Sequence, residues 1–223
     1  MSGAPAWTLL TEACRWNLLA GARWLLGRGA NPNAAGQSGH PPRSVAAGQG
    51  HTKIARLLLD RGADLEAAAP GPGRGTAGIM PPLLRAAWWL HADIVALLLA
   101  HGADPNALST GDATVLMVVA MGLHPQRADG AFMIGALIAA GADPLLTDAE
   151  GRTVPEVFAY RQCGDLLEIL DAVLARPQHT IVRRRLLERT APEKRAIWLP
   201  RSEALENWAS SVRAWGRRAR RAR

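Results

Sequence analysis

The sequence has few of the features that mark secreted or membrane proteins. Its 223 residues hold two cysteines, Cys14 and Cys163, and we interpret these as free thiols in a reducing compartment. The longest apolar run, residues 113–123, is far shorter than the roughly 20 residues of a membrane-spanning helix. No basic segment followed by an apolar run opens the chain, so no signal peptide is predicted. These absences favour a cytoplasmic protein, with the nucleus or delivery into a host cell as alternatives.

Motifs of catalysis and metal binding are also missing. The sequence contains no Gly-x-Ser-x-Gly, no Cys-x-x-Cys and no pair of histidines at metal-ligand spacing. The glycine-rich stretch over residues 69–82 lacks the Gly-Lys-Ser/Thr of a phosphate-binding loop, and it is interpreted as a flexible insertion. We therefore predict no enzymatic activity, no cofactor, no metal and no small-molecule substrate.

Phenylalanine and tyrosine are scarce, whereas tryptophan occurs eight times. The charge is unevenly placed. Residues 1–175 carry 12 basic and 15 acidic side chains (net −3), and residues 176–223 carry 14 basic and 4 acidic ones (net +10), which together give the net charge of +7. The basic character of the whole chain therefore describes its C-terminal part.

A short phrase recurs four times along the first 145 residues. It ends a leucine-rich stretch with Gly-Ala-Asn or Gly-Ala-Asp, and its glycines are Gly29, Gly62, Gly102 and Gly141, at spacings of 33, 40 and 39 residues. Glycine can take a left-handed backbone and so end a helix. The Asp or Asn that follows favours a turn, and in three copies a proline prevents the helix from continuing.

The front half of each unit repeats as well. Counting back 21 residues from the first three glycines gives Thr8, Pro41 and Pro81, where the chain reads TLLTEA, PPRSVA and PPLLRA. These openings resemble the Thr-Pro-Leu-His-x-Ala of ankyrin repeats, and residues 48–64, GQGHTKIARLLLDRGAD, resemble the second half of that repeat. A fourth unit begins at Thr114, and a fifth keeps Gly-x-Thr but has no closing Gly-Ala-Asp.

The resemblance implies an all-α ankyrin-repeat solenoid, residues 1–175, in which each repeat is two antiparallel helices and a projecting loop. About five repeats are expected, near residues 7–33, 39–66, 79–106, 111–144 and 151–175. The fifth is interpreted as the capping repeat. His51 and His91 occupy the usual histidine position, where the ring is expected to fix the local turn. His101 is expected to face solvent or the end of its own helix.

In ankyrin repeats the first helices and the loop tips form a concave surface that binds proteins. The resemblance implies that the seventh and eighth residues after each opening position point outward from it. Tryptophan and arginine are the residues most often found at binding hot spots. The predicted protein-binding residues are Arg15, Trp16, Gln37, Gln49, Arg74, Trp88, Trp89 and Asp112. The alternative is that Trp88 or Trp89 is buried beneath the insertion. The chain is thus predicted to be a non-catalytic interaction module: an adaptor, an inhibitor or immunity-type partner, or a host-directed effector.

Residues 176–223 are predicted to form an arginine-rich extension with helices over residues 178–190 and 202–215. In the second helix an apolar stripe includes Trp208 and Trp215, and an arginine cluster follows it. Three interpretations are open: the stripe packs on the last repeat, the helix binds a partner or an anionic membrane, or the cluster binds nucleic acid or acts as a nuclear-localisation signal. The residues concerned lie in 205–223 and include Trp208, Trp215, Arg217, Arg218, Arg220 and Arg221.

Overall fold

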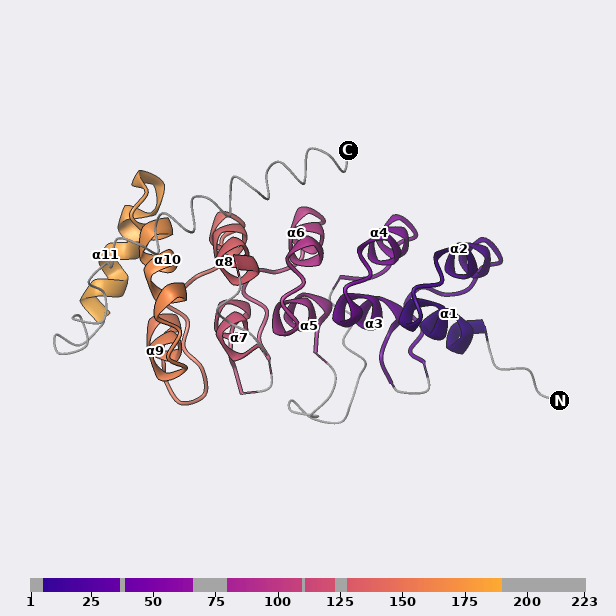
Figure 1. Ribbon diagram of the computed structural model, residues 1–223, viewed down its shortest axis with the longest axis horizontal. Helices are drawn as coiled ribbons and strands as arrows, with labels where there is room; N and C mark the ends of the chain where they lie inside the picture. Colours follow the sequence, from indigo (N-terminus) through magenta and orange to yellow (C-terminus); the bar gives the residue numbers. More distant parts are fainter. Residues whose placement is uncertain (1–5, 37–38, 66–79, 110, 123–127, 190–223) are drawn as a thin grey trace.

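The computed structural model describes residues 6–36, 39–65, 80–109, 111–122 and 128–189, and in these ranges the regular structure is helical apart from two isolated β-bridges. Figure 1 shows two rows of helices. The first-helix row is α1 (Ala6–Arg15), α3 (Pro42–Gln49), α5 (Pro82–Trp88), α7 (Val115–Met121) and α9 (Val154–Tyr160). The second-helix row is α2 (Leu19–Gly27), α4 (Thr52–Asp60), α6 (Ala92–Ala100), α8 (Ala128–Ala139) and α10 (Gly164–Leu174). Neighbours within each row pack side by side, so the predicted all-α solenoid is confirmed.

The repeated glycines end helices of the second-helix row. Gly29, Gly62, Gly102 and Gly141 have φ angles of 85°, 77°, 87° and 97°, in the left-handed region that side chains disfavour. After each glycine the backbone N–H of the following alanine returns to a carbonyl five residues earlier, as Ala103 N does to Leu98 O at 3.1 Å. This bond satisfies a carbonyl in the last turn of the helix. The glycine is therefore the helix stop that the sequence predicts.

Two asparagines then join neighbouring turns. The Oδ1 of Asn106 accepts a hydrogen bond from Asp143 N at 2.7 Å, and its Nδ2 donates one to Gly141 O at 3.2 Å. Asn33 makes the same pair of bonds, with Asp64 N at 2.8 Å and Gly62 O at 3.4 Å. We call these two residues the asparagine clamps. Each connects the turn of one repeat to the Gly-Ala-Asp of the next.

The histidines at the shared repeat position also bridge repeats. His51 Nε2 lies 3.2 Å from Arg15 O, and His91 Nε2 lies 3.1 Å from Gly48 O. Because a carbonyl only accepts, the imidazole nitrogen donates in both bonds. These rings were predicted to fix their own local turn. Each instead bonds to a carbonyl near the end of the first helix of the preceding repeat, so the predicted partner is wrong. His101 Nδ1 bonds to Leu97 O at 2.8 Å, at the end of its own helix as predicted.

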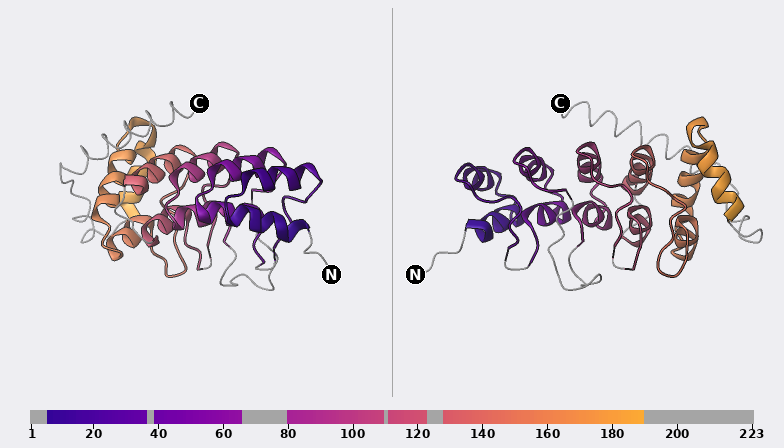
Figure 2. Two further views of the ribbon diagram at one scale, coloured as in Figure 1. Left: turned by 45° about the vertical axis from the view of Figure 1, so that its right-hand side comes forward. Right: turned by 180° about the vertical axis from the view of Figure 1, so that it is seen from behind.

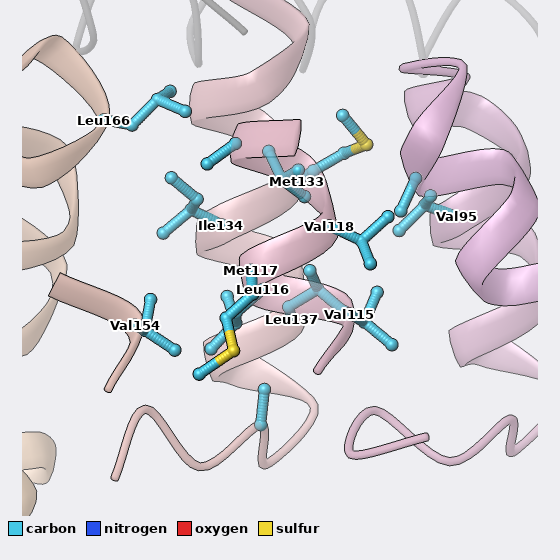
Figure 3. Close-up of a cluster of buried hydrophobic side chains, with 14 of the residues drawn as sticks. Val95, Val115, Leu116, Met117, Val118, Met133, Ile134, Leu137, Val154 and Leu166 are labelled. Atoms are coloured by element: carbon cyan, nitrogen blue, oxygen red, sulfur yellow. The ribbon is translucent and has the colours of Figure 1, made fainter. Parts of the chain in front are cut away.

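The buried apolar side chains form two clusters. The larger extends from Ala47 of α3 to α11 (Thr180–Arg189) and includes Val95, Val115, Ile134 and Leu166, which Figure 3 shows between neighbouring helices. The smaller is built mainly from α1, α2 and α4 and includes Leu10, Leu26 and Leu58. Leu59 packs against both clusters. The two cores therefore meet between the second and third helix pairs.

The stack continues past the fifth pair. After a short 3-10 turn, Pro177–His179, α11 places Leu186 in the larger core. Arg183 pairs with Asp171 of α10 through contacts of 2.9 and 3.2 Å. The fifth repeat, predicted as the cap, is thus itself covered by α11, which lies beside α10 in both views of Figure 2. The predicted helix over residues 202–215 lies outside the described residues. Among the helices described, none has the length and apolarity to cross a membrane.

Candidate functional site

The exposed side chains at the ends of the first-helix row form the surface that we call the first-helix face. Trp16 follows α1 and is 69% exposed, Trp89 follows α5 and is 46% exposed, and Gln49 at the end of α3 is also exposed. Trp88 differs, because its side chain is partly buried and packs against the larger core. Two of the three predicted tryptophans are therefore accessible, and the third contributes to packing.

Glu12 orients the first pair of predicted residues. Its Oε2 accepts a hydrogen bond from Trp16 Nε1 at 3.2 Å, and its Oε1 lies 3.3 Å from Arg15 Nε. Exposed pairs of this kind contribute little to stability. Their effect is positional, because one carboxylate on α1 fixes both an indole and a guanidinium that face solvent.

Tyr160 is a candidate that the sequence analysis did not include. It is the seventh residue after Thr153, which is the opening position of the fifth unit, and it is 71% exposed. The Arg152 guanidinium lies 5.1 Å from the centre of its ring, within the range of a cation–π contact. Extending the count used for the first three units to the fifth would have found this residue.

The loop that carries Arg152 is held by a buried carboxylate. Asp148 accepts hydrogen bonds from Arg152 N and Arg152 Nε, both at 2.8 Å. Burial alone raises the pKa of Asp148, but these hydrogen bonds and the Arg152 charge outweigh burial and hold that pKa below its usual value. The Arg152–Tyr160 contact is therefore presented from a rigid loop.

Asp112 lies on the tip of the preceding loop, where it is exposed with a φ of 57° between the bridged residues Leu108 and Thr114. Aspartate tolerates this backbone better than most residues. The predicted loop residues Gln37 and Arg74 lie outside the described residues, as do the tail residues from Trp208 to Arg221.

The family model for ankyrin repeats (three copies) matches residues 10–109. Residues 10–109 of the chain belong to the ankyrin-repeat family. The matched segment includes Trp16, Gln49 and Trp89. Ankyrin repeats are protein–protein interaction modules, and the family is typically non-catalytic. No curated protein matches the sequence.

The two thiols of the chain, Cys14 and Cys163, are free and buried. Burial raises the pKa of Cys14 to about 12 and also raises the pKa of Cys163. A thiol of raised pKa is a poor nucleophile, because the thiolate is the reactive form. In the ranges that the structure describes, no group of three or more His, Cys, Asp or Glu side chains is placed to hold a metal ion.

Proposed function

We propose that this ankyrin-repeat protein is a non-catalytic module that holds a protein partner on its first-helix face. Trp16 and Trp89 are the main contacts, and Arg15, Gln49 and the loop residue Asp112 surround them. The observation that carries the proposal is that both tryptophans occupy the eighth position of their units and are exposed. Exposed aromatic side chains at equivalent places on one face are typical of an interface.

In the free protein, both tryptophans leave much of their side-chain surface in water. The Trp16 indole makes one hydrogen bond, to the Glu12 carboxylate, and the side chain keeps most of its surface in water. Burying a tryptophan in a well-packed interface often accounts for about 2 kcal/mol or more of binding energy. Two such residues supply a large share of the binding energy, and their polar neighbours fix the orientation of the partner.

The proposed role is that of an adaptor, an inhibitor or immunity-type partner, or a host-directed effector. We place it in the cytoplasm, which suits the two unpaired thiols, Cys14 and Cys163. The exposed Tyr160 extends the same set of repeat positions to the fifth unit.

A displayed random-peptide library selected on the full chain tests the proposal. Binders should lose about 30-fold in affinity, or more, on Trp16→Ala or Trp89→Ala. Trp24→Ala is the matched control. Trp24 is 60% exposed, but it lies on α2 of the second-helix row, where Arg28 stacks 4.9 Å from its ring.

Equal losses in all three variants, or none in any, would contradict the proposal. Binders that ignore the tryptophans and weaken steeply with salt would instead indicate the arginine-rich extension as the binding element. Trp88→Ala is excluded from this comparison. The Trp88 ring packs against the larger core, so its removal would lower stability, and a loss of binding could not be assigned to a surface contact.

A further inference from the structure

Two basic residues from neighbouring helix pairs contact each other, and a third ends a neighbouring helix, near enough for its charge to act on both. Arg15 ends α1, His40 lies two residues before α3, and Arg85 lies on α5. Arg85 Nη1 is 3.1 Å from His40 Nδ1. A guanidinium has no acceptor, so His40 Nδ1 accepts this hydrogen bond and the imidazole is neutral in this arrangement.

Arg85 is held in place by the shape of α3. A side chain at Gly48 would put its Cβ 2.7 Å from Arg85 Nε and 3.1 Å from Arg85 Cδ. The Arg85 side chain therefore lies across the surface that Gly48 leaves free, and it is half-buried there. The absence of a side chain at 48 is what brings this guanidinium to the first-helix face.

The cluster is short of negative charge. Among the described residues no carboxylate pairs with Arg85, and Arg15 has only Glu12. Burial lowers the pKa of His40, and the charges of Arg85 and Arg15 lower it further. Burial and then the Arg15 charge lower the pKa of Arg85 in the same direction. The Arg15 charge thus opposes positive charge on both of its neighbours.

We infer that Arg15 and Arg85, with His40 beside them, bind a carboxylate of an acidic segment in the protein partner. The inference rests on the proposed function and names the chemistry of the partner at that surface. A guanidinium pairs with a carboxylate in a planar, charge-assisted geometry, and an anion here relieves the repulsion between the two arginines. Two cations with Glu12 nearby leave a net charge close to one, which suits a carboxylate better than the continuous phosphates of a nucleic acid.

Side-chain Nε–Hε signals of ¹⁵N-labelled arginine in the full chain test this inference, with acetylated hexaglutamate as the probe and hexaglutamine as its uncharged match. Site-resolved signals are needed because the arginine-rich extension also attracts a polyanion. The Arg15 and Arg85 signals should shift saturably with hexaglutamate and stay unchanged with hexaglutamine.

The Arg85→Gln variant should raise the dissociation constant for hexaglutamate, read from the Arg15 signal, by about tenfold. This is the usual scale for losing a hydrogen bond to a charged group. Arg56→Gln is the matched control, since Arg56 is an exposed arginine on α4 of the other row and the charge change is identical. Circular dichroism establishes that each variant is folded. If Arg85→Gln is not, Arg15→Gln read at Arg85 replaces it.

Arg15 and Arg85 signals that stay fixed while other arginines saturate would overturn the inference. So would shifts produced by duplex DNA but not by hexaglutamate. Peptide binders that need Trp16 and Trp89 but ignore Arg85→Gln would leave the proposed function standing and remove only the inference. Hexaglutamate-induced shifts of the Arg85 signal, with no binder that depends on the tryptophans, would support the carboxylate site and contradict the proposed function.

Discussion

The asparagine clamp at Asn106 gives the sharpest test of how the repeats are held together. Asn106→Ala removes the acceptor for Asp143 N at 2.7 Å and the donor to Gly141 O at 3.2 Å. A hydrogen bond contributes about 1 kcal/mol net. Because Asn106 is half-buried and water replaces part of what is lost, we expect the free energy of unfolding to fall by about 1–2 kcal/mol.

Urea denaturation followed by circular dichroism measures this change. Asn106→Asp keeps the acceptor for Asp143 N but sets a carboxylate oxygen against Gly141 O in place of the donor, so its free energy of unfolding should also lie below that of the wild type. Asn33→Ala should behave like Asn106→Ala. The two clamps connect different pairs of repeats, so the double variant should show the sum of the single effects.

An Asn106→Ala variant within about 0.5 kcal/mol of the wild type, the range of ordinary surface substitutions, would refute the clamp as a stabilising contact. An Asn106→Asp variant as stable as the wild type would show that the donor to Gly141 O contributes nothing to stability.

Three further predictions concern single residues. Gln162 is exposed with a φ of 57°, so Gln162→Gly should raise the free energy of unfolding by about 0.5–1 kcal/mol in thermal melts. Asn17→Gly, also at a φ of 57°, should gain less because asparagine tolerates this backbone. A Gln162→Gly variant less stable than the wild type would contradict the claim that the backbone at Gln162 is strained. The lowered pKa of Asp148 stabilises the folded state above the pKa of the unfolded chain, and this contribution is lost as pH falls through the folded pKa. Asp148→Asn should therefore be less stable at neutral pH and lose less of its stability between about pH 5 and pH 2, and identical acid slopes in urea titrations would rule this out. Cys14, buried with a pKa of about 12, should react with a thiol reagent at the rate at which the protein opens, and a fast Cys14 reaction in the native state, identified against Cys14→Ala, would count against its burial.

Local signals account for most of the fold that the sequence predicts. Each glycine of the repeated phrase adopts the left-handed backbone that ends a helix, as at Gly62 and Gly102, and this preference belongs to the residue itself. The left-handed residue between the two helices of a pair was harder to anticipate. The second unit uses Gly50 there, whereas the third uses Leu90, with a φ of 58° and a buried side chain. Burial of the Leu90 side chain in the core offsets the cost of a backbone conformation that leucine disfavours. No local sequence pattern predicts this conformation.

The surface was predictable in position but not in composition. The repeat count placed Trp16 and Trp89 correctly at helix ends, yet it could not separate Trp89 from Trp88, because the burial of Trp88 depends on the adjacent helix pairs. The contact of Arg85 with His40 joins residues 45 positions apart. It exists because Gly48 has no side chain, and a spacing rule within one repeat carries no information about it.

The division of the core into two clusters has a consequence for cooperativity. The clusters meet between the second and third helix pairs, and the position that Asn33 and Asn106 occupy in their units holds Glu66 after Asp64, so no clamp amide is available at this joint. In a nearest-neighbour description of repeat stability, this joint then rests on helix packing, in which Ala47 of α3 belongs to the larger cluster and Leu97 of α6 to the smaller. Trp16 and Trp89 lie on opposite sides of the joint. A partner that binds both tryptophans adds its binding energy to this packing and makes the helix pairs on the two sides of the joint less free to open separately.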